Sequence, residues 1–182
     1  MPAVYPMPVM MVATYDDKGT VDVMAASWVM ICEPDQIALF LDRKRKTTEN
    51  ILKKRAFTVS IADRPHMEAA DYFGMVSGRR VWNKFERSGL TAIESNRVHA
   101  PIIDEFPVVM ECELLEVVDT EHIYCLVGKI CNTKADERVL SGNGKIDPLL
   151  CDALIYDEFQ RGYYSSGEKV GQAFCVGKRF YG

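Results

Sequence analysis

Four cations followed by two threonines, between Asp42 and Asn50, form a residue pattern suited to binding an anion. The segment reads Asp-Arg-Lys-Arg-Lys-Thr-Thr-Glu-Asn, and its threonines stand where a helix is expected to begin. The first N–H groups of a helix have no partner within the helix and carry partial positive charge. A helix start flanked by cations and hydroxyls therefore suits one phosphate group. The alternative is a solvated basic loop in which Thr47 or Thr48 only caps the helix.

A second segment, Met24-Ala25-Ala26-Ser27-Trp28, suits close contact with a flat ligand. It is a run of small residues between two apolar strands, and it ends in a hydroxyl beside a large aromatic ring. Small side chains let the backbone approach a planar molecule closely. A bulge or a tight bend between strands would produce the same pattern.

The third candidate is the turn Ser77-Gly78-Arg79-Arg80, which precedes Trp82-Asn83-Lys84-Phe85. A flexible turn with cations and aromatic rings could lie over a planar ligand. In the alternative, Trp82 and Phe85 are spaced by three residues on a helix and simply pack into the core.

The residues that usually carry acid–base or metal chemistry are not grouped. His66, His99 and His122 are scattered, and His122 lies in a short polar turn. The sequence has no G-x-S-x-G, Walker, Rossmann or H-E-x-x-H motif and no isolated pair of carboxylates flanked by apolar residues. The six cysteines show no C-x-x-C spacing, and we interpret them as buried free thiols in a reducing cytosol. No catalytic side chain and no metal site is assigned.

Composition indicates a globular protein. The chain has 182 residues, of which 48% are hydrophobic and 26% charged, and no linker divides it, so we expect a single domain over 1–182. The net charge of −4 argues against a nucleic-acid partner. The sequence shows no secretion signal and no apolar run long enough to cross a bilayer, so we expect a cytoplasmic protein without a membrane partner.

Short, β-branched apolar runs between turn signals predict mostly strands. We expect strands over 8–14, 21–24, 28–32, 36–41, 57–61, 108–118, 124–130 and 154–156, and helices over 47–55, 67–73 and 82–88. The turn Asp16-Asp17-Lys18-Gly19 joins the first two strands into a hairpin. Many strands with only a few helices favour a mostly β fold. We expect a closed or nearly closed antiparallel barrel with peripheral helices.

These segments, in this order, resemble the flavin reductase-like family of FMN-binding split barrels, which includes flavoredoxin-type proteins. Each motif is short and degenerate, so the resemblance depends on their order and spacing over most of the chain. Besides the three segments above, the similar stretches are 5–14, 84–85, 89–91, 100–102, 107–113, 122–129 and 163–171.

The resemblance implies an antiparallel split β-barrel of Greek-key type that binds FMN. It also implies a homodimer with one FMN per subunit near the subunit interface. The isoalloxazine ring would lie on the backbone of Ala25, Ala26, Ser27 and Trp28. The remaining cofactor contacts would come from Arg43, Lys46, Thr47, Thr48 and Asn50 at the phosphate and from Ser77, Gly78, Arg79 and Lys84 nearby.

Two positions depart from the family pattern. Asp22 stands where many relatives carry asparagine. The turn Thr120-Glu121-His122 replaces the Gly-Asp-His common in NADH-using reductases. His122 is the candidate substrate contact, and the second departure leaves the electron donor open between NAD(P)H and a redox protein.

The flavin itself carries the redox chemistry in such proteins, which agrees with the lack of a catalytic constellation. We therefore expect an FMN-dependent oxidoreductase that passes electrons from NAD(P)H or another donor to free flavin or a small acceptor. The first alternative is a flavoredoxin-type electron carrier without a nicotinamide site. The second is a barrel that binds a ligand or partner without turnover.

Overall fold

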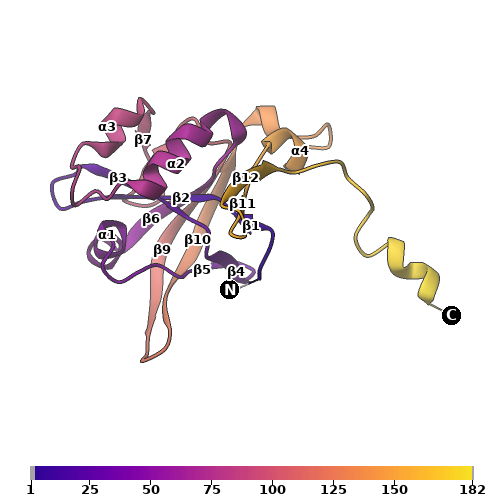
Figure 1. Ribbon diagram of the computed structural model, residues 1–182, viewed down its shortest axis with the longest axis horizontal. Coiled ribbons are helices and arrows are strands. Elements are labelled where there is room, and N and C mark those ends of the chain that lie inside the picture. Colours follow the sequence, from indigo (N-terminus) through magenta and orange to yellow (C-terminus); the bar gives the residue numbers. More distant parts are fainter. Residues whose placement is uncertain (1–2, 182) are drawn as a thin grey trace.

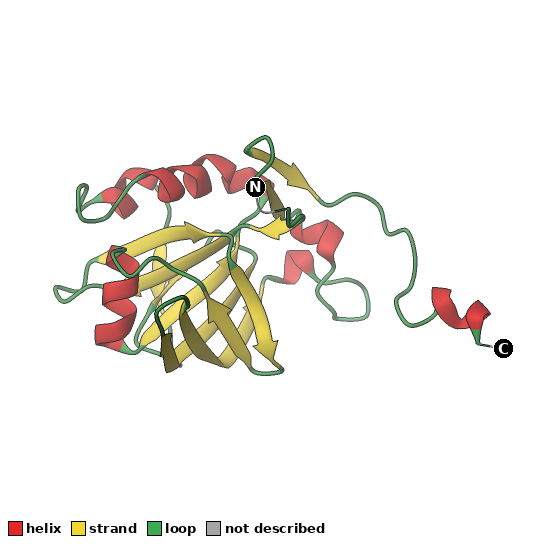
Figure 2. Cartoon of the chain, turned by 60° about the horizontal axis from the view of Figure 1, so that its bottom comes forward, coloured by secondary structure: helices red, strands yellow, loops and turns green. Residues whose placement is uncertain are grey.

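The computed structural model describes residues 3–181, and its main feature is one large, curled antiparallel sheet with helices outside it (Figures 1 and 2). The strand order is β3-β2-β6-β9-β10-β5-β4. Its strands are β2 (Met10–Tyr15), β3 (Val21–Ala26), β4 (Val29–Glu33), β5 (Gln36–Leu39), β6 (Ala56–Ile61), β9 (Val108–Asp119) and β10 (Tyr124–Ala135).

Within residues 3–181, two small sheets and four short helices complete the architecture. One sheet contains β1 (Met7–Pro8), β11 (Leu154–Asp157) and β12 (Gly162–Ser165), and the other pairs β7 (Ala92–Glu94) with β8 (Pro101–Ile103). The helices are α1 (Lys46–Lys54), α2 (Met67–Met75), α3 (Lys84–Ser88) and α4 (Pro148–Cys151). Three 3₁₀ turns cover Arg64–His66, Glu137–Val139 and Val176–Phe180.

The connection between β3 and β4 explains why the sheet curls. These strands lie at opposite edges of the seven-stranded sheet, yet only Ser27 and Trp28 separate them in sequence. A chain of that length spans roughly 10 Å, so the two edges must approach each other where the segment crosses. The result is a barrel split between its edge strands, and the predicted mostly β split barrel is confirmed.

The core has two parts because β2 is buried on both faces. Met10 and Val12 of β2 face the barrel interior, where they pack with residues such as Phe57 of β6. Met11 and Ala13 belong to a second cluster, which also contains residues of α2 and α3. This strand is therefore apolar from Met10 to Ala13 instead of alternating.

One glycine permits the packing of the barrel interior. A Cβ atom on Gly128 of β10 would lie 2.4 Å from the ring of Phe57, so a side chain there would have to displace that buried ring. Phe57 is fully buried and contributes one of the largest side chains of the core.

Two expectations about side chains are wrong in part. Phe85 is buried in the second cluster as the core alternative requires, but Trp82 is exposed, because α3 begins only at Lys84. Three cysteines are buried as expected, and burial raises their pKa, whereas Cys32, Cys131 and Cys175 are exposed. Within the described chain, no helix has the length and apolar character needed to span a membrane.

Candidate functional site

The start of α1 leaves three backbone N–H groups without acceptors. The helix begins at Lys46 after Arg45, whose side chain does not cap it, and the first helical bond runs from Glu49 N–H to the Arg45 carbonyl at 3.2 Å. The N–H groups of Lys46, Thr47 and Thr48 make no hydrogen bond within residues 3–181. Open amides of this kind attract an anion.

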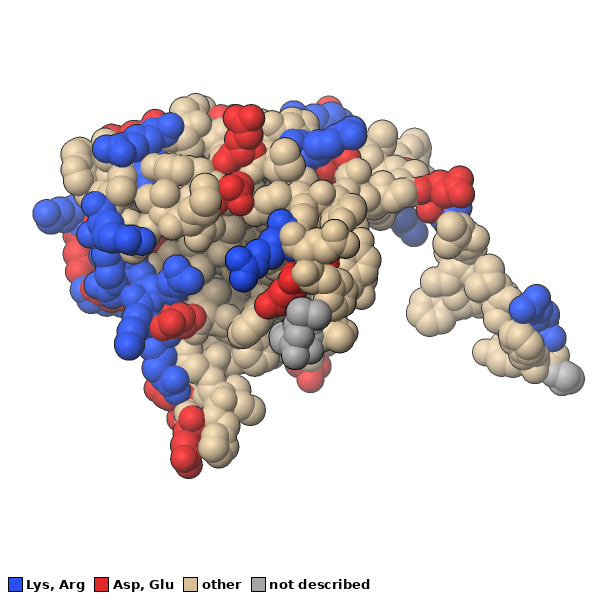
Figure 3. All heavy atoms as spheres, viewed as in Figure 1, with Lys and Arg blue, Asp and Glu red and all other residues tan. Residues whose placement is uncertain are grey.

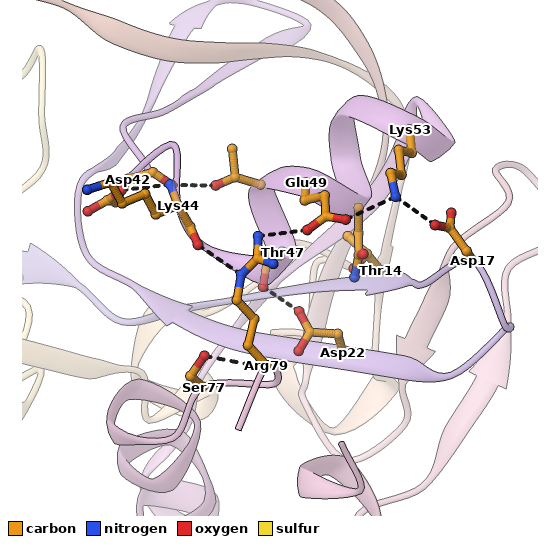
Figure 4. A network of polar contacts seen from close by, with 12 residues as sticks. Thr14, Asp17, Asp22, Asp42, Lys44, Thr47, Glu49, Lys53, Ser77 and Arg79 are labelled. Carbon is orange, nitrogen blue, oxygen red and sulfur yellow. Dashed lines mark hydrogen bonds and ion pairs between the residues drawn. The ribbon is translucent and has the colours of Figure 1, made fainter. Parts of the chain in front are cut away.

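The predicted threonine caps are wrong, because both hydroxyls are used elsewhere. Thr47 donates to Oδ2 of Asp22 at 2.6 Å, as Figure 4 shows. Thr48 donates to the Asp42 carbonyl at 2.9 Å. The groups left for an anion are therefore the helix amides and the neighbouring cations, and not the threonine hydroxyls.

The three segments chosen from the sequence meet at this helix start. A small pocket of about 30 Å³ is lined by β3, by the start of α1, by α2 and by the turn after α2. The predicted residues that line it are Ala25, Lys46, Thr47, Ser77, Gly78 and Lys84. We call it the phosphate pocket, after the FMN phosphate that the resemblance implies at this helix start. Through Lys46 and Gly78 it adjoins a larger cavity of about 430 Å³, whose wall includes Arg79 and the exposed Trp82.

A buried ion pair lies beside the phosphate pocket. Asp22 on β3 is buried, and the Nζ atom of Lys84 lies 3.4 Å from its Oδ1 atom. Lys84 also donates to the Val76 carbonyl at 3.1 Å. Burial lowers the pKa of Lys84, and the Asp22 charge opposes that effect. The pocket thus holds a cation that is already paired.

Gly78 is fixed by the same carboxylate. A Cβ atom there would lie 2.3 Å from Oδ1 of Asp22, so any side chain would push the carboxylate away. Glycine lets the turn after α2 approach β3 this closely. The sequence marked Gly78 as part of a flexible turn, and the resemblance implied a cofactor contact there, but neither indicated this close approach to Asp22.

Arg79 ties the turn after α2 to α1. Its Nε atom donates to the Lys44 carbonyl at 3.1 Å, and its guanidinium pairs with Glu49 at 2.7 Å (Figure 4). Lys53, one turn further along α1, pairs with the same Glu49 at 3.0 Å and with Asp17 at 2.7 Å. Arg79 therefore positions a wall of the pocket while its own charge is shared with Glu49.

Two predicted residues lie away from the phosphate pocket and support the helix. Thr48 and Asn50 are buried and do not line it. Asn50 donates from Nδ2 to the Thr14 hydroxyl at 3.0 Å, which attaches α1 to β2. Its Oδ1 atom is buried without a partner in the described structure.

The other end of the candidate flavin segment opens into a second cavity. The Phe40 N–H donates to the Trp28 carbonyl at 3.0 Å, which joins the β3–β4 connection to the loop before α1. A cavity of about 500 Å³ lies there, and we call it the Trp28 cavity. Its lining residues are Trp28, Phe40, Leu41, Asp42, Arg43, Lys44, His122, Ile123 and Tyr124.

Arg43 and His122 belong to this second cavity. Arg43 pairs with Asp119 and lies over the ring of Tyr124, with 4.5 Å to its centroid. The structure therefore does not bring Arg43 to the phosphate pocket, where Arg45 lies instead. His122 is exposed on the hairpin turn between β9 and β10. It shares the cavity with Trp28 and Arg43, although its turn is distant in sequence.

The remaining candidate residues, Ala26 and Ser27, lie between the phosphate pocket and the Trp28 cavity in the sequence. Ala26 ends β3, and Ser27 lines an apolar groove with Trp28, beside the Trp28 cavity. Figure 3 shows Lys and Arg side chains gathered on the side of the molecule that carries α1 in Figure 1. Among residues 3–181 no group of His, Cys, Asp and Glu side chains could hold a metal ion.

Comparison with known proteins identifies the family. The family model described as "Flavin reductase like domain" matches residues 1–164. The chain belongs to the flavin reductase-like family. Its split barrel is similar to flavoredoxin of Desulfovibrio vulgaris (Miyazaki F), with 35% identity, a TM-score of 0.92, and coverage of 98% of this chain and 96% of that chain.

Further relatives support the family assignment. A flavoredoxin from Methanosarcina acetivorans is 27% identical, with a TM-score of 0.88 and coverage of 97% of this flavin reductase-like chain and 94% of the other. An uncharacterised protein of Aeropyrum pernix is 28% identical over 117 residues, which is 63% of this chain and 44% of that protein. The chain thus spans less than half the length of this curated relative.

The sequence did not place two residues in the site. Asp22 was noted only as a departure from the family pattern, whereas it is buried beside the phosphate pocket, and Arg45 lines that pocket. Asp22 interrupts the apolar strand Val21-Asp22-Val23-Met24, and a lone carboxylate in such a strand is the signal that could have placed it in a polar pocket. Arg45 carried no signal that separated it from the adjacent cations Arg43 and Lys44.

Proposed function

We propose that this protein is an FMN-dependent oxidoreductase that passes electrons from NAD(P)H or another donor to free flavin or a small acceptor. The observation that carries the proposal is the meeting of three separate segments around the open start of α1. Open helix amides, Lys46 and the buried Lys84 lie together there, as a phosphate monoester requires.

The residues between the phosphate pocket and the Trp28 cavity could hold the rest of the cofactor. The FMN phosphate would be held by the amides of Lys46 to Thr48 and by Lys46, with Ser77 and Lys84 beside it. The ring would lie along Ala25 to Trp28, where small side chains leave the backbone accessible. When bound, FMN supplies the hydride and electron transfer chemistry through its ring, so the chain needs no catalytic side chain of its own.

The chain's own residues would orient the cofactor and form a place for its reaction partner. The Trp28 cavity adjoins the candidate ring segment and has about 500 Å³ of space, which is enough for a planar ring to stack. His122 stands at its wall. We propose His122 as a contact for the donor or acceptor and not for the FMN phosphate.

A flavoredoxin-type electron carrier is the second candidate function. The 35% identity with a flavoredoxin over nearly the whole chain is compatible with it. The residues before His122, Thr120 and Glu121, also differ from the Gly-Asp of NADH-using reductases. A carrier would bind the same cofactor in the same place, but its partner at the Trp28 cavity would be a redox protein.

Spectroscopy of the purified protein distinguishes these functions. We expect flavin bands in the visible spectrum after addition of FMN, and bleaching of these bands on anaerobic addition of NADH or NADPH. Bands that dithionite bleaches but neither nicotinamide affects would favour the carrier. A protein that does not take up FMN would contradict both functions and would favour a barrel that binds another ligand.

We further propose a cytoplasmic homodimer. Apolar side chains such as Met30 and Ile31 on the edge strand β4 are exposed in one copy, and a second copy would cover them. The free cysteines fit a reducing compartment. Sedimentation at micromolar concentration should give a dimer, and a monomer that still binds FMN would contradict the assembly.

A further inference from the structure

The C-terminal segment leaves the body of the protein after β12 and projects into solvent (Figures 1 and 3). We call residues 167–181 the tail, and all of them are exposed. Just before it, Ser166 donates to the Pro148 carbonyl at 3.4 Å, which attaches the base of the tail to the body. The hydrogen bonds recorded within the tail are local, such as Lys169 to Gln172 at 2.7 Å.

The tail exposes several large apolar side chains, which is unusual for a segment that is surrounded by water. Phe174 is 97% exposed, and Val170, Val176, Phe180 and Tyr181 are also exposed. The 3₁₀ turn at Val176–Phe180 has five residues, and a helix of that length is not stable in water by itself. Five large apolar side chains and an isolated turn indicate a segment that packs on another surface.

A groove of matching character lies beside the edge strand β4. It has a volume of about 500 Å³ and is lined mainly by apolar side chains from the N-terminal segment, the β3–β4 connection, β4 and Phe40, which follows β5. Trp28 is 59% and Met30 is 60% exposed in it. Since β4 ends the sheet, no strand of the described chain pairs with its outer edge. We call this surface the β4 groove.

The charges of the tail and the groove are complementary. The tail carries Lys169, Lys178 and Arg179 against a single Glu168. Glu158 lines the β4 groove, and Glu33 lies exposed at the end of β4. Docking of the tail would therefore place cations beside exposed carboxylates.

We infer that the tail of one copy docks in the β4 groove of a second copy, and that the exchange is reciprocal. The tail points away from its own body, and a two-fold arrangement covers both tails and both grooves at once. The inference rests on the homodimer proposed above. Because Trp28 belongs both to the groove and to the candidate flavin segment, each tail would cover one side of its partner's cofactor site.

Two native cysteines make this contact testable. Cys175 lies in the tail and Cys32 lies on β4, and both are exposed. A short bis-maleimide should join them into a covalent dimer in the wild type. The cross-link should be lost in Cys32→Ser and in Cys175→Ser. It should be kept in Cys131→Ser, which removes the other exposed thiol. Co-expression of Cys32→Ser with Cys175→Ser should restore one bond between the two chains.

Substitutions in the tail provide a second measurement. The double variant Phe174→Ser/Phe180→Ser should raise the dimer dissociation constant at least about tenfold, because aromatic anchors carry much of an interface. Leu115→Ser, which changes an exposed side chain on β9, is the matched control and should leave dimerisation unchanged.

The contradicting results are specific. Tail exchange would be overturned by a dimer that forms no Cys32–Cys175 cross-link, or by a cross-link that joins two cysteines of the same chain. An unchanged dimer dissociation constant in the tail variant would also overturn it. FMN uptake is measured on the same samples. Loss of uptake with an intact bond would contradict the proposed function and leave the tail assignment standing.

Discussion

Asp22 and Lys84 form an ion pair next to the candidate phosphate pocket, with Nζ 3.4 Å from Oδ1 and side chains that are 7% and 3% exposed. The same carboxylate accepts the Thr47 hydroxyl and limits the turn at Gly78. One acidic residue in an otherwise apolar strand thus organises the three segments of the site. It also places a negative charge where the proposed cofactor brings another.

Replacing this carboxylate should strengthen FMN binding while it weakens the fold. In Asp22→Asn the repulsion of the phosphate disappears, and Lys84 and the Thr47 hydroxyl become available to it. We expect FMN affinity to rise about tenfold, or ~1.4 kcal/mol. Affinity for riboflavin, which has no phosphate, should stay the same. The apoprotein should lose about 3 kcal/mol of stability, because Lys84 is left buried without its partner.

Calorimetric titration and thermal unfolding measure these two effects. Asp17→Asn is the control, since Asp17 is an exposed carboxylate on the adjacent turn that pairs with Lys53. Equal changes for FMN and riboflavin would show that Asp22 acts only on the fold.

Gly78 should not tolerate a side chain. Because a Cβ atom would lie 2.3 Å from Oδ1 of Asp22, Gly78→Ala should cost about 1 to 3 kcal/mol of unfolding free energy and lower FMN affinity. Gly142→Ala is the matched control, with no atom within 4 Å of the added carbon. Chemical denaturation measures the loss. Equal stability of the two variants would contradict the close approach.

His122 should affect the electron donor and not the flavin. Loss of one hydrogen bond is worth about 1 kcal/mol, so His122→Ala should slow anaerobic bleaching by NADH about fivefold while FMN affinity stays constant. Glu121→Ala, on the same exposed turn, controls for general changes in the hairpin. If bleaching proceeds at the wild-type rate in His122→Ala, the histidine is only a surface residue.

Glu111 predicts the acid limit of stability. It is fully buried in β9, and although burial alone raises its pKa, hydrogen bonds from Ser95 and Asn132 and the charge of Lys134 bring the pKa below the ordinary 4.5. A carboxyl group whose pKa is lowered in the folded state stabilises the protein at pH values above the pKa that the group has in the unfolded chain. That contribution is lost as the pH falls through the folded-state pKa. Unfolding free energy should therefore decrease below about pH 4.5.

The matched variant is Glu111→Gln, whose stability should depend less on pH in that range than the wild type does. Denaturant unfolding between pH 3 and pH 6 makes the comparison. Parallel curves for the two proteins would show that other carboxyl groups set the acid limit.

Much of the fold followed from the sequence because its strands are short, β-branched and separated by turn residues. The hairpin of β2 and β3 is an example, since the turn from Asp16 to Gly19 fixes its register. The start of α3 was misplaced because Trp82 has the spacing of a core residue with Phe85. The spacing of two residues is a local property of the sequence. The exposure of Trp82 depends on the tertiary position of the turn between α2 and α3, which the spacing does not reveal.

The site was predictable as segments but not as contacts. Lys46, Ser77 and Lys84 come from separate segments and line one pocket, as the motifs suggested. The hydrogen-bond or ion-pair partner of each hydroxyl and cation was not predictable. Arg43 turns to Asp119, a partner 76 positions away, and only the tertiary fold of the β9–β10 hairpin brings it there.

The central claim is that the start of α1 holds the phosphate of FMN, and paired titrations of FMN and riboflavin test it most directly. Lys46→Ala should lower FMN affinity about tenfold or more, because a charged contact is worth roughly 1.5 to 3 kcal/mol, and should leave riboflavin affinity unchanged. Lys53→Ala, near the other end of the same helix, should alter neither. An unchanged FMN affinity in Lys46→Ala, or an equal loss for both ligands, would contradict the account.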